Sequence, residues 1–211
     1  MGRTMADEIG SPAHRGDSAS GGIAALEAAA RSATARGLPP VERWNPPYCG
    51  DLDIRIAADA TWFYMGTPIG RKPLVKLFSS VLRRDADGRH YLVTPVEKIG
   101  ITVDDAPFLA VEMAVEGEGR SQRIAFRTNA DDVVSVDAEH PLRFLQEEGT
   151  DGLKPYVRVR GGLDALVARS VTYDLVALAV EEAMAEGPAL GVWSAGQFFV
   201  IAPGEGTEAC S

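Results

Sequence analysis

Residues 52–65 read LDIRIAADATWFYM and predict two β-strands joined by a turn. In the first half, apolar and polar side chains alternate as they do in a strand with one buried face: Leu52, Ile54 and Ile56 alternate with Asp53 and Arg55. The segment ADA at 58–60 turns the chain, and TWFYM returns as an aromatic, β-prone strand. This hairpin makes a β-rich fold the starting expectation.

A helix and a third strand follow the hairpin. Pro73 suits the first turn of a helix, and apolar side chains then recur at helical spacing: Leu74, Leu77, Phe78, Val81 and Leu82. The helix ends near the polar segment RRDADG, and RHYLVT at 89–94 is the next predicted strand. The first unit therefore has the order β-β-α-β.

The last third of the chain shows the same order. YVRVRGGLDALVAR predicts two short strands around Gly161 and Gly162, residues 170–187 predict an amphipathic helix, and LGVWSAGQFFVI predicts a strand. Arg55 precedes Leu74 by about the separation at which Arg158 precedes Leu175, so the sequence predicts a duplicated β-β-α-β core rather than a solenoid of short repeats.

Further strands are predicted between the two copies, at 96–103, 108–115, 122–127 and 133–136. The predicted class is α+β, with mostly antiparallel sheets in two small β-rich domains. The expected domains are residues 39–105 and 106–203. A mobile tail with a short helix, built on Ile23, Leu26 and Ala30, is expected at 1–38, and a second tail at 204–211.

The composition is that of a globular protein, with 45% hydrophobic and 24% charged residues. A formal net charge of −9 argues against non-specific binding to nucleic acid or to an anionic membrane. Two cysteines, Cys49 and Cys210, make no disulfide framework. No apolar run reaches the roughly 20 residues needed to cross a bilayer, and the expected location is the cytoplasm.

Catalytic motifs have weak support. Cys49 would need a histidine to form a thiolate, and only His140 is placed to serve. Asp51 and Asp53 could hold a magnesium ion against a phosphate, but Asp-x-Asp is common by chance and the pattern favours a solvated or salt-bridged strand face. GTPIGRKP at 66–73 lacks the spacing of a P-loop. We expect neither a catalytic residue, nor a metal, nor a cofactor.

Cations give the better candidate site. Arg71 and Lys72 lie at a predicted helix N-terminus, where free N–H groups also attract anions. Tyr156, Arg158 and Arg160 share one strand face. Arg123, Arg127 and Asn129 share another. Guanidinium groups bind phosphate or carboxylate in a bidentate manner, although cross-strand pairing with Asp53, Glu97 or Glu112 would account for them as well.

The strings PPVERWNPPYCGDLDIRIAADATWFYMGTPIGRKPLVKLFSSVLRRDADG, YLVTPVEKIGITVDDAPFLAVEM, FRTNADDVVSVDAEHPLRF and PYVRVRGGLDALVARSVTYDLV, with GVWSAGQFF, resemble a bacterial family, domain of unknown function 1285. The resemblance covers residues 38–201. It implies a duplicated β-rich core, a C-terminal domain superficially like pleckstrin-homology folds, and an interdomain groove for a nucleotide-like ligand in a signalling or stress-related role.

Together these observations predict a non-catalytic protein that holds a small anionic or nucleotide-like ligand between two domains, with Trp62 or Tyr156 as a stacking surface. A protein-interaction module with a protein partner, and a metal-dependent enzyme acting on a phosphorylated substrate, remain open as alternatives. The candidate binding residues are Asp53, Arg55, Trp62, Arg71, Lys72, Arg127, Asn129, Tyr156, Arg158 and Arg160.

Overall fold

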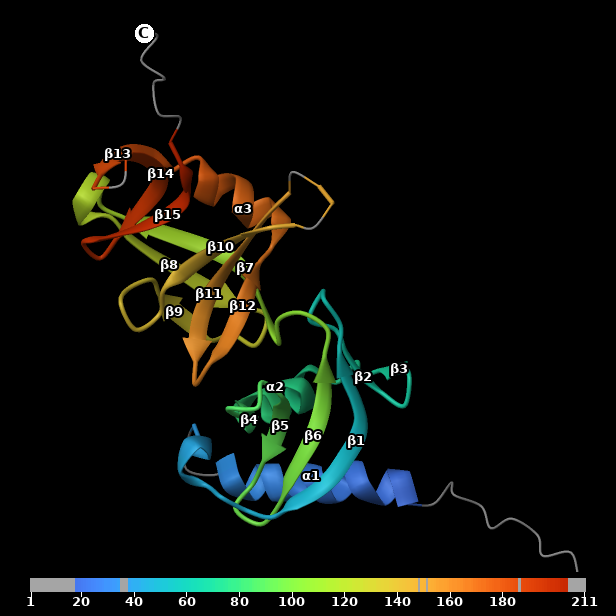
Figure 1. Cartoon of the computed structure of the whole chain (residues 1–211). Helices are drawn as coiled ribbons and strands as arrows, with labels where there is room; N and C mark the ends of the chain where they lie inside the picture. The colour runs from blue at the N-terminus through green and yellow to red at the C-terminus, as the bar shows by residue number, and fades with distance from the viewer. Residues whose placement is uncertain (1–17, 35–37, 148, 151, 186, 205–211) are drawn as a thin grey trace, which may run out of the picture.

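The computed structural model describes residues 18–34, 38–147, 149–150, 152–185 and 187–204. It contains two β-rich domains, each built on a six-stranded sheet, and few helices (Figure 1). The α+β class and the two β-rich domains are thus confirmed. Of the tail with a short helix predicted at 1–38, residues 1–17 and 35–37 lie outside the described residues, as do residues 205–211 of the second predicted tail, including Cys210. No described helix is both long and apolar enough to cross a membrane.

The N-terminal domain carries a mixed sheet with the order β3-β2-β1-β6-β5-β4. Strand β1 pairs with β2 in antiparallel orientation and with β6 in parallel. The strands are β1 (Tyr48–Ile56), β2 (Trp62–Tyr64), β3 (Thr67–Pro68), β4 (Leu82–Arg84), β5 (His90–Val93) and β6 (Lys98–Val103), and the helices are α1 (Ser18–Thr34), the 3-10 turn η1 (Val41–Arg43) and α2 (Lys72–Ser80).

The apolar periodicity of the sequence accounts for the core of this domain. Ile54 and Ile56 are buried on one face of β1, whereas Asp53 and Arg55 are exposed on the other. Helix α2 has Pro73 in its first turn and buries Leu74 and Phe78. Helix α1 packs on α2 and buries Leu26 and Ala30, as the sequence predicted.

The C-terminal domain has a six-stranded sheet with the order β10-β11-β12-β7-β8-β9 and a three-stranded sheet with the order β13-β14-β15. Its core includes Phe108, Phe126, Val157, Leu163 and Phe199. The strands are β7 (Phe108–Glu116), β8 (Arg123–Thr128), β9 (Val133–Ser135), β10 (Leu142–Gln146), β11 (Leu153–Arg160), β12 (Leu163–Val167), β13 (Val180–Met184), β14 (Gly187–Ser194) and β15 (Gln197–Pro203), with η2 (Gly119–Ser121) and α3 (Arg169–Val176).

The two six-stranded sheets share one topology. In each sheet, the first three strands along the chain form one antiparallel group and the last three form another. The two groups are joined by parallel pairing of the first strand with the last: β1 with β6, and β7 with β12. The order β-β-α-β does occur in both halves of the chain. However, the strands that occupy equivalent places in the two six-stranded sheets are not the strands that the sequence analysis matched to each other. Strand β11 corresponds to β5 and not to β1, so Arg158 is not the counterpart of Arg55.

The helix expected over residues 170–187 is only partly correct. Helix α3 ends at Val176, and residues 180–184 form β13, which pairs with β14 from Val180↔Gly191 to Met184↔Gly187. The VEEAM segment has helix-forming residues, but the ladder with β14 satisfies its backbone groups and overrides that weak local preference.

Contacts between the domains come from α2, from the segment after β6 and from the β11–β12 hairpin, which points toward the N-terminal domain (Figure 1). Arg160 Nη2 donates to the carbonyl oxygen of Ser79 at 2.7 Å, and Lys76 pairs with Asp131. Gly161 has a φ of +47°, and a Cβ there would lie 2.2 Å from Oε1 of Glu42. The positive φ favours glycine at this turn, and a Cβ would also displace the end of the flexible Glu42 side chain in η1.

Candidate functional site

A small cavity of ≈ 160 Å³ lies where the two domains meet. Strands β4 and β5 contribute one side of it, and β10, β11 and β12 contribute the other. The lining residues are Arg84, His90, Asp105, Pro107, Arg143, Leu145, Tyr156, Gly162 and Asp164. Cationic, aromatic and hydrogen-bonding side chains from two domains thus converge on one space, and ligand sites occur preferentially at such domain interfaces.

Strand pairing positions the cationic and aromatic groups. Arg84 and His90 are partners across the β4–β5 ladder, so both reach the cavity from the same edge of their sheet. Arg143 and Tyr156 are partners across β10–β11, and the guanidinium carbon of Arg143 lies 5.0 Å from the centre of the Tyr156 ring. This stacking holds the guanidinium group in place through a cation–π contact.

Two carboxylates are shared among three cations beside the cavity. Asp164 accepts hydrogen bonds from Arg143 Nη2 at 2.8 Å and from Arg158 Nε at 2.6 Å. Asp105 accepts from Lys154 Nζ at 2.9 Å and from the Tyr156 hydroxyl at 2.8 Å. Each carboxylate is therefore fully engaged by donors of this chain.

Arg84 has no carboxylate partner among the described residues. Its Nε donates to the carbonyl oxygen of Gly88 at 3.3 Å, and its guanidinium group otherwise faces solvent and the cavity. The cations at or beside the cavity, Arg84, Arg143, Lys154 and Arg158, thus outnumber the carboxylates, Asp105 and Asp164. This local positive excess contrasts with the formal net charge of −9 of the chain.

His90 and Tyr156 add titratable groups. Burial, followed by the charge of Arg84, lowers the pKa of His90, while Asp164 across the domain boundary opposes the shift. Burial and the hydrogen bond to Asp105 raise the pKa of Tyr156, which keeps the phenol protonated and able to donate. With its pKa lowered, the His90 imidazole is neutral at neutral pH.

A larger, more open depression of ≈ 570 Å³ is also lined by Arg84. It is lined by Glu42, Arg43, Trp44, Asn45, Arg83, Arg84, Asp85, Ala86 and Asp87. Arg84 thus lines both spaces.

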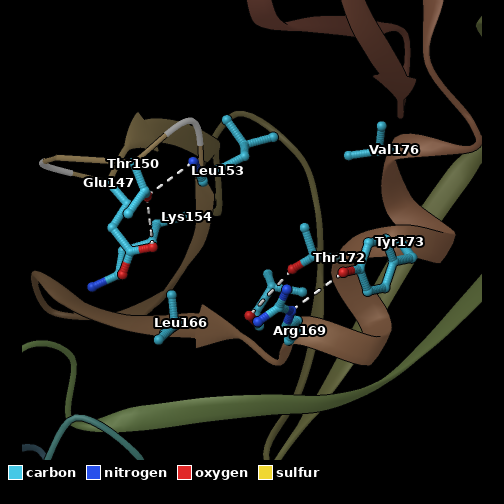
Figure 2. Close-up of a pocket in the computed structure, with 11 residues that line it drawn as sticks. Glu147, Thr150, Leu153, Lys154, Leu166, Arg169, Thr172, Tyr173 and Val176 are labelled. Atoms are coloured by element: carbon cyan, nitrogen blue, oxygen red, sulfur yellow. Dashed lines mark hydrogen bonds between the residues drawn. The ribbon is translucent and has the colours of Figure 1, made fainter.

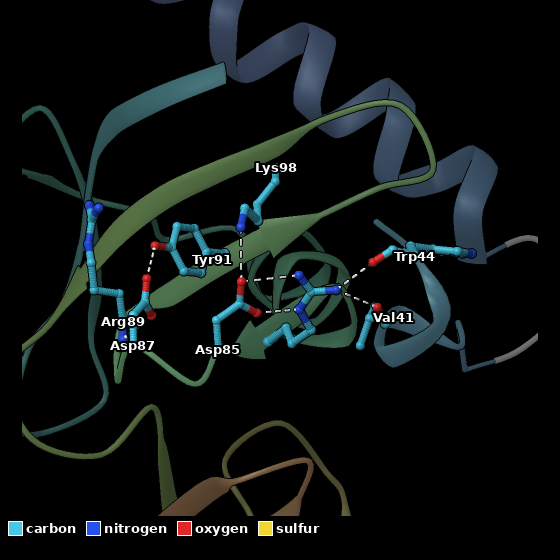
Figure 3. Close-up of polar contacts among 8 residues, drawn as sticks. Val41, Trp44, Asp85, Asp87, Arg89, Tyr91 and Lys98 are labelled. Carbon is cyan, nitrogen blue, oxygen red and sulfur yellow. Dashed lines mark hydrogen bonds and ion pairs between the residues drawn. The ribbon is translucent and has the colours of Figure 1, made fainter. Parts of the chain in front are cut away.

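The wall of the depression is held by a buried polar cluster (Figure 3). Arg83 has 9% of its side chain exposed and donates to the carbonyl oxygens of Val41 and Trp44 at 2.8 and 2.7 Å. Its Nε also bonds Oδ1 of Asp85 at 2.6 Å, and Lys98 bonds Oδ2 at 3.0 Å. The cluster ties the connector before β1 to β4 and β6.

Most of the residues predicted from the sequence lie elsewhere. Only Tyr156 lines the interdomain cavity, and Arg158 touches it through Asp164. Trp62 is a correction: it is 2% exposed and packs against Phe78 with ring centres 6.2 Å apart, so it offers no surface for stacking.

The predicted arginines mostly pair with carboxylates, which was the alternative interpretation. Arg55 pairs with Asp104, Arg127 with Glu112 and Asp131, and Arg160 with Asp132. The pairing of Arg127 with Glu112 is confirmed. Asn129 Oδ1 accepts from the Leu109 N–H at 3.1 Å, Arg71 lies 3.8 Å from Glu27, and Lys72 and Asp53 are exposed.

The catalytic alternatives gain no geometric support. Cys49 is exposed, and its Sγ lies 3.5 Å from the carbonyl oxygen of Pro47. His140 instead contacts Asp137, at 3.1 Å. Asp51 is engaged by Tyr48 and Arg89. Within the described residues, no group of three or more His, Cys, Asp or Glu side chains is placed to hold a metal ion.

Arg84, His90 and Arg143 line the cavity but were not among the binding residues predicted from the sequence. His90 stands in the predicted strand 89–94 and Arg84 in the polar segment before it, but no strand was predicted around Arg143, which lies in β10. Their convergence depends on which strands pair and on how the two domains dock, and neither is encoded in local periodicity. The one available signal was the cluster RRDADGRH at 83–90, which combines three arginines and a histidine in a short hairpin.

Two family models match the chain. The model described as "Domain of unknown function (DUF1285), N-terminal domain" matches residues 39–106, and "Protein of unknown function (DUF1285), C-terminal domain" matches residues 107–201. No curated protein matches the chain.

Solved structures give two further similarities. A DUF1285 family protein from Silicibacter pomeroyi DSS-3 is 48% identical, with a TM-score of 0.78, over 85% of this chain and 96% of that one. A DUF1285 family protein from Shewanella baltica OS155 is 27% identical, with a TM-score of 0.47, over 59% of this chain and 90% of that one.

Proposed function

The chain belongs to the DUF1285 family, and from that premise we propose that it is a cytoplasmic, non-catalytic protein that binds an anionic, nucleotide-like small molecule between its two domains. A role in signalling or the response to stress fits such a binding protein. The observation that carries the proposal is Arg84, a cation without a carboxylate partner among the described residues, at the mouth of an interdomain cavity.

The donors around the cavity suit a phosphate group. Arg84 and Arg143 present guanidinium groups from opposite domains, and such groups bind phosphate in a bidentate manner. Arg143 is already stacked on Tyr156, so it loses little conformational freedom on binding. A bound anion also favours a proton on His90, which adds a third donor.

The size of the cavity limits what it can hold. Its ≈ 160 Å³ is below the roughly 300–1,000 Å³ of most ligand pockets. We therefore assign it to the anionic group alone. The rest of the ligand would lie in the adjoining depression, where Trp44 is half-buried and Asn45 is exposed, on the far side of Arg84.

Isothermal titration with AMP, GMP and inorganic phosphate tests this proposal. We expect Arg84→Gln and Arg143→Gln each to weaken binding on the order of tenfold or more, because each removes a charge-assisted contact. Arg71→Gln is the matched control, since Arg71 is an exposed arginine of the same domain as Arg84 that lies near Glu27 instead. If neither cavity variant changes the affinity, or if no anion binds the wild type, the proposal is wrong.

A second candidate function is docking of a protein partner on the three-stranded sheet. Val180 and Val200 flank Gly191 in register, so they lie on one face, and both are exposed, at 43% and 45%. Trp193 and Phe198 pair on the same face. Co-purification of one partner that is lost in Val200→Glu, without any bound small molecule, would favour this alternative.

A further inference from the structure

A second and larger cavity lies within the C-terminal domain and shares no lining residue with the interdomain site. It has a volume of ≈ 760 Å³, within the range of small-molecule pockets. The end of the β10–β11 hairpin forms one side and the first two turns of α3 form the other, with β12 between them (Figure 2).

The cavity combines an apolar surface with charged groups. Leu153, Leu166, Val167 and Val176 line it together with the ring of Tyr173. Tyr173 is 63% exposed and Val176 is 37% exposed, so apolar surface remains uncovered at the helix side. A ligand with a hydrocarbon part would remove this surface from water, which is favourable.

The polar groups of the cavity differ in how far they are already satisfied. Lys154 pairs with Asp105 at 2.9 Å, and Thr172 donates to the carbonyl oxygen of Ala168 at 3.2 Å. Glu147 Oε2 accepts from the Thr150 hydroxyl at 3.1 Å. These groups are engaged by the chain itself.

Arg169 is the exception. Its Nε donates to the Tyr173 hydroxyl at 3.2 Å, which orients the guanidinium group over the cavity (Figure 2). Its two terminal nitrogen atoms have no acceptor among the described residues, and no carboxylate there lies within ion-pair distance. A planar pair of donors left open in this way matches the two oxygens of a carboxylate.

We propose that this cavity binds an amphipathic carboxylate, with the carboxylate on Arg169 and the hydrocarbon part against Leu153, Leu166 and Val176. The inference is independent of the function proposed for the interdomain site, because the two cavities share no lining residue. Lys154, which lines this cavity, donates to Asp105, which lines the interdomain cavity.

Titration with octanoate and with 1-octanol tests the proposal in the full-length protein. Octanoate is expected to bind, and 1-octanol, which has the same chain but no charge, to bind on the order of tenfold more weakly. In backbone-amide NMR spectra, octanoate should shift the signals of residues 153–154 and 166–176.

Three variants test whether the carboxylate of octanoate binds Arg169. Arg169→Gln is expected to weaken octanoate binding roughly 10- to 100-fold and to leave 1-octanol binding unchanged. Glu147→Gln, which removes a nearby negative charge, should strengthen octanoate binding on the order of twofold. Arg84→Gln is the control for the interdomain site and should bind octanoate as the wild type does.

Equal affinity for octanoate and 1-octanol, unchanged octanoate binding in Arg169→Gln, or amide shifts confined to the interdomain cavity would each overturn the proposal. Arg169 is exposed, so its replacement is expected to leave the fold intact. Loss of nucleotide binding in Arg84→Gln with retained octanoate binding would support both sites separately.

Discussion

Replacement of Arg83 by glutamine is expected to destabilise the N-terminal domain strongly. Arg83 is nearly fully buried and donates to two backbone carbonyl oxygens and to Asp85 (Figure 3). Glutamine is shorter and uncharged, so it cannot span these acceptors. The variant removes the Arg83 donor from the carbonyl oxygen of Trp44 and from that of Val41, which keeps only the Trp44 N–H at 3.2 Å, and it leaves Asp85 with Lys98 as its remaining cation.

The expected loss in the free energy of unfolding of Arg83→Gln follows from these contacts. Removal of one partner of a buried ion pair typically costs about 3–5 kcal/mol. Because Lys98 still compensates Asp85, we expect the lower end, about 3 kcal/mol. For a chain of 211 residues, each kcal/mol lowers Tm by roughly 2–4 °C, which gives a loss of about 6–12 °C.

Urea titration and calorimetry of matched variants provide the assay. Arg84→Gln is the control, because Arg84 is the exposed neighbour and its loss should change the unfolding free energy by less than about 0.5 kcal/mol. The double variant Arg83→Gln/Asp85→Asn should recover part of the loss, since it removes the buried carboxylate that has lost a partner.

The pH dependence gives an independent check. Burial alone would raise the pKa of Asp85, but the hydrogen bonds from Arg83 and Lys98 outweigh it, so the pKa lies below its ordinary value of 3.8. The stability that this carboxylate contributes is present above pH 3.8 and is lost as the pH falls through its folded-state pKa. A Tm within about 1 °C of the wild type for Arg83→Gln would refute the role assigned to the cluster.

Three further predictions concern the interdomain region. The wild type should lose stability as the pH falls below about 6.5, because the pKa of His90 is lowered in the folded state and the unfolded chain takes up the proton more readily than the folded chain does. In His90→Gln this loss should be smaller. Identical pH–stability curves for the two proteins would contradict the prediction. Tyr156→Phe should cost about 1.5 kcal/mol in urea titration through loss of the hydrogen bond to Asp105, and no change would contradict it. Arg160→Met should cost about 2–3 kcal/mol by removing the bridge to Ser79 and should speed hydrogen exchange at the hairpin, so unchanged exchange would count against this contact as a domain clamp.

Local patterns in the sequence predicted β1, β2, β5 and most of α2, but they extended the helix to Leu82, which begins β4, and they missed β3 and β4. The alternation around Ile54 and the helical spacing of Leu74 and Phe78 both report burial within one element, which a linear pattern encodes directly. The segment 180–184 shows the limit, because its helix-forming residues pair as a strand with β14. That outcome depends on a ladder with a distant partner.

The candidate site was harder to predict for the same reason. Arginines in strands were the predicted binding groups, but Arg55 and Arg127 are neutralised by the carboxylates of Asp104 and Glu112. Arg84 differs only in lacking such a partner among the described residues. Whether a cation is paired depends on strand register and domain docking, so a linear sequence ranks these arginines equally.

The most direct test of the interdomain site is a crystal structure of the protein grown with AMP. If the phosphate binds between Arg84 and Arg143 as proposed, difference density for it is expected there, with the adenine extending past Arg84 toward Trp44 and Asn45. AMP bound with its phosphate at any other place, or an empty cavity in crystals grown at an AMP concentration that saturates the protein in solution, would contradict the proposal.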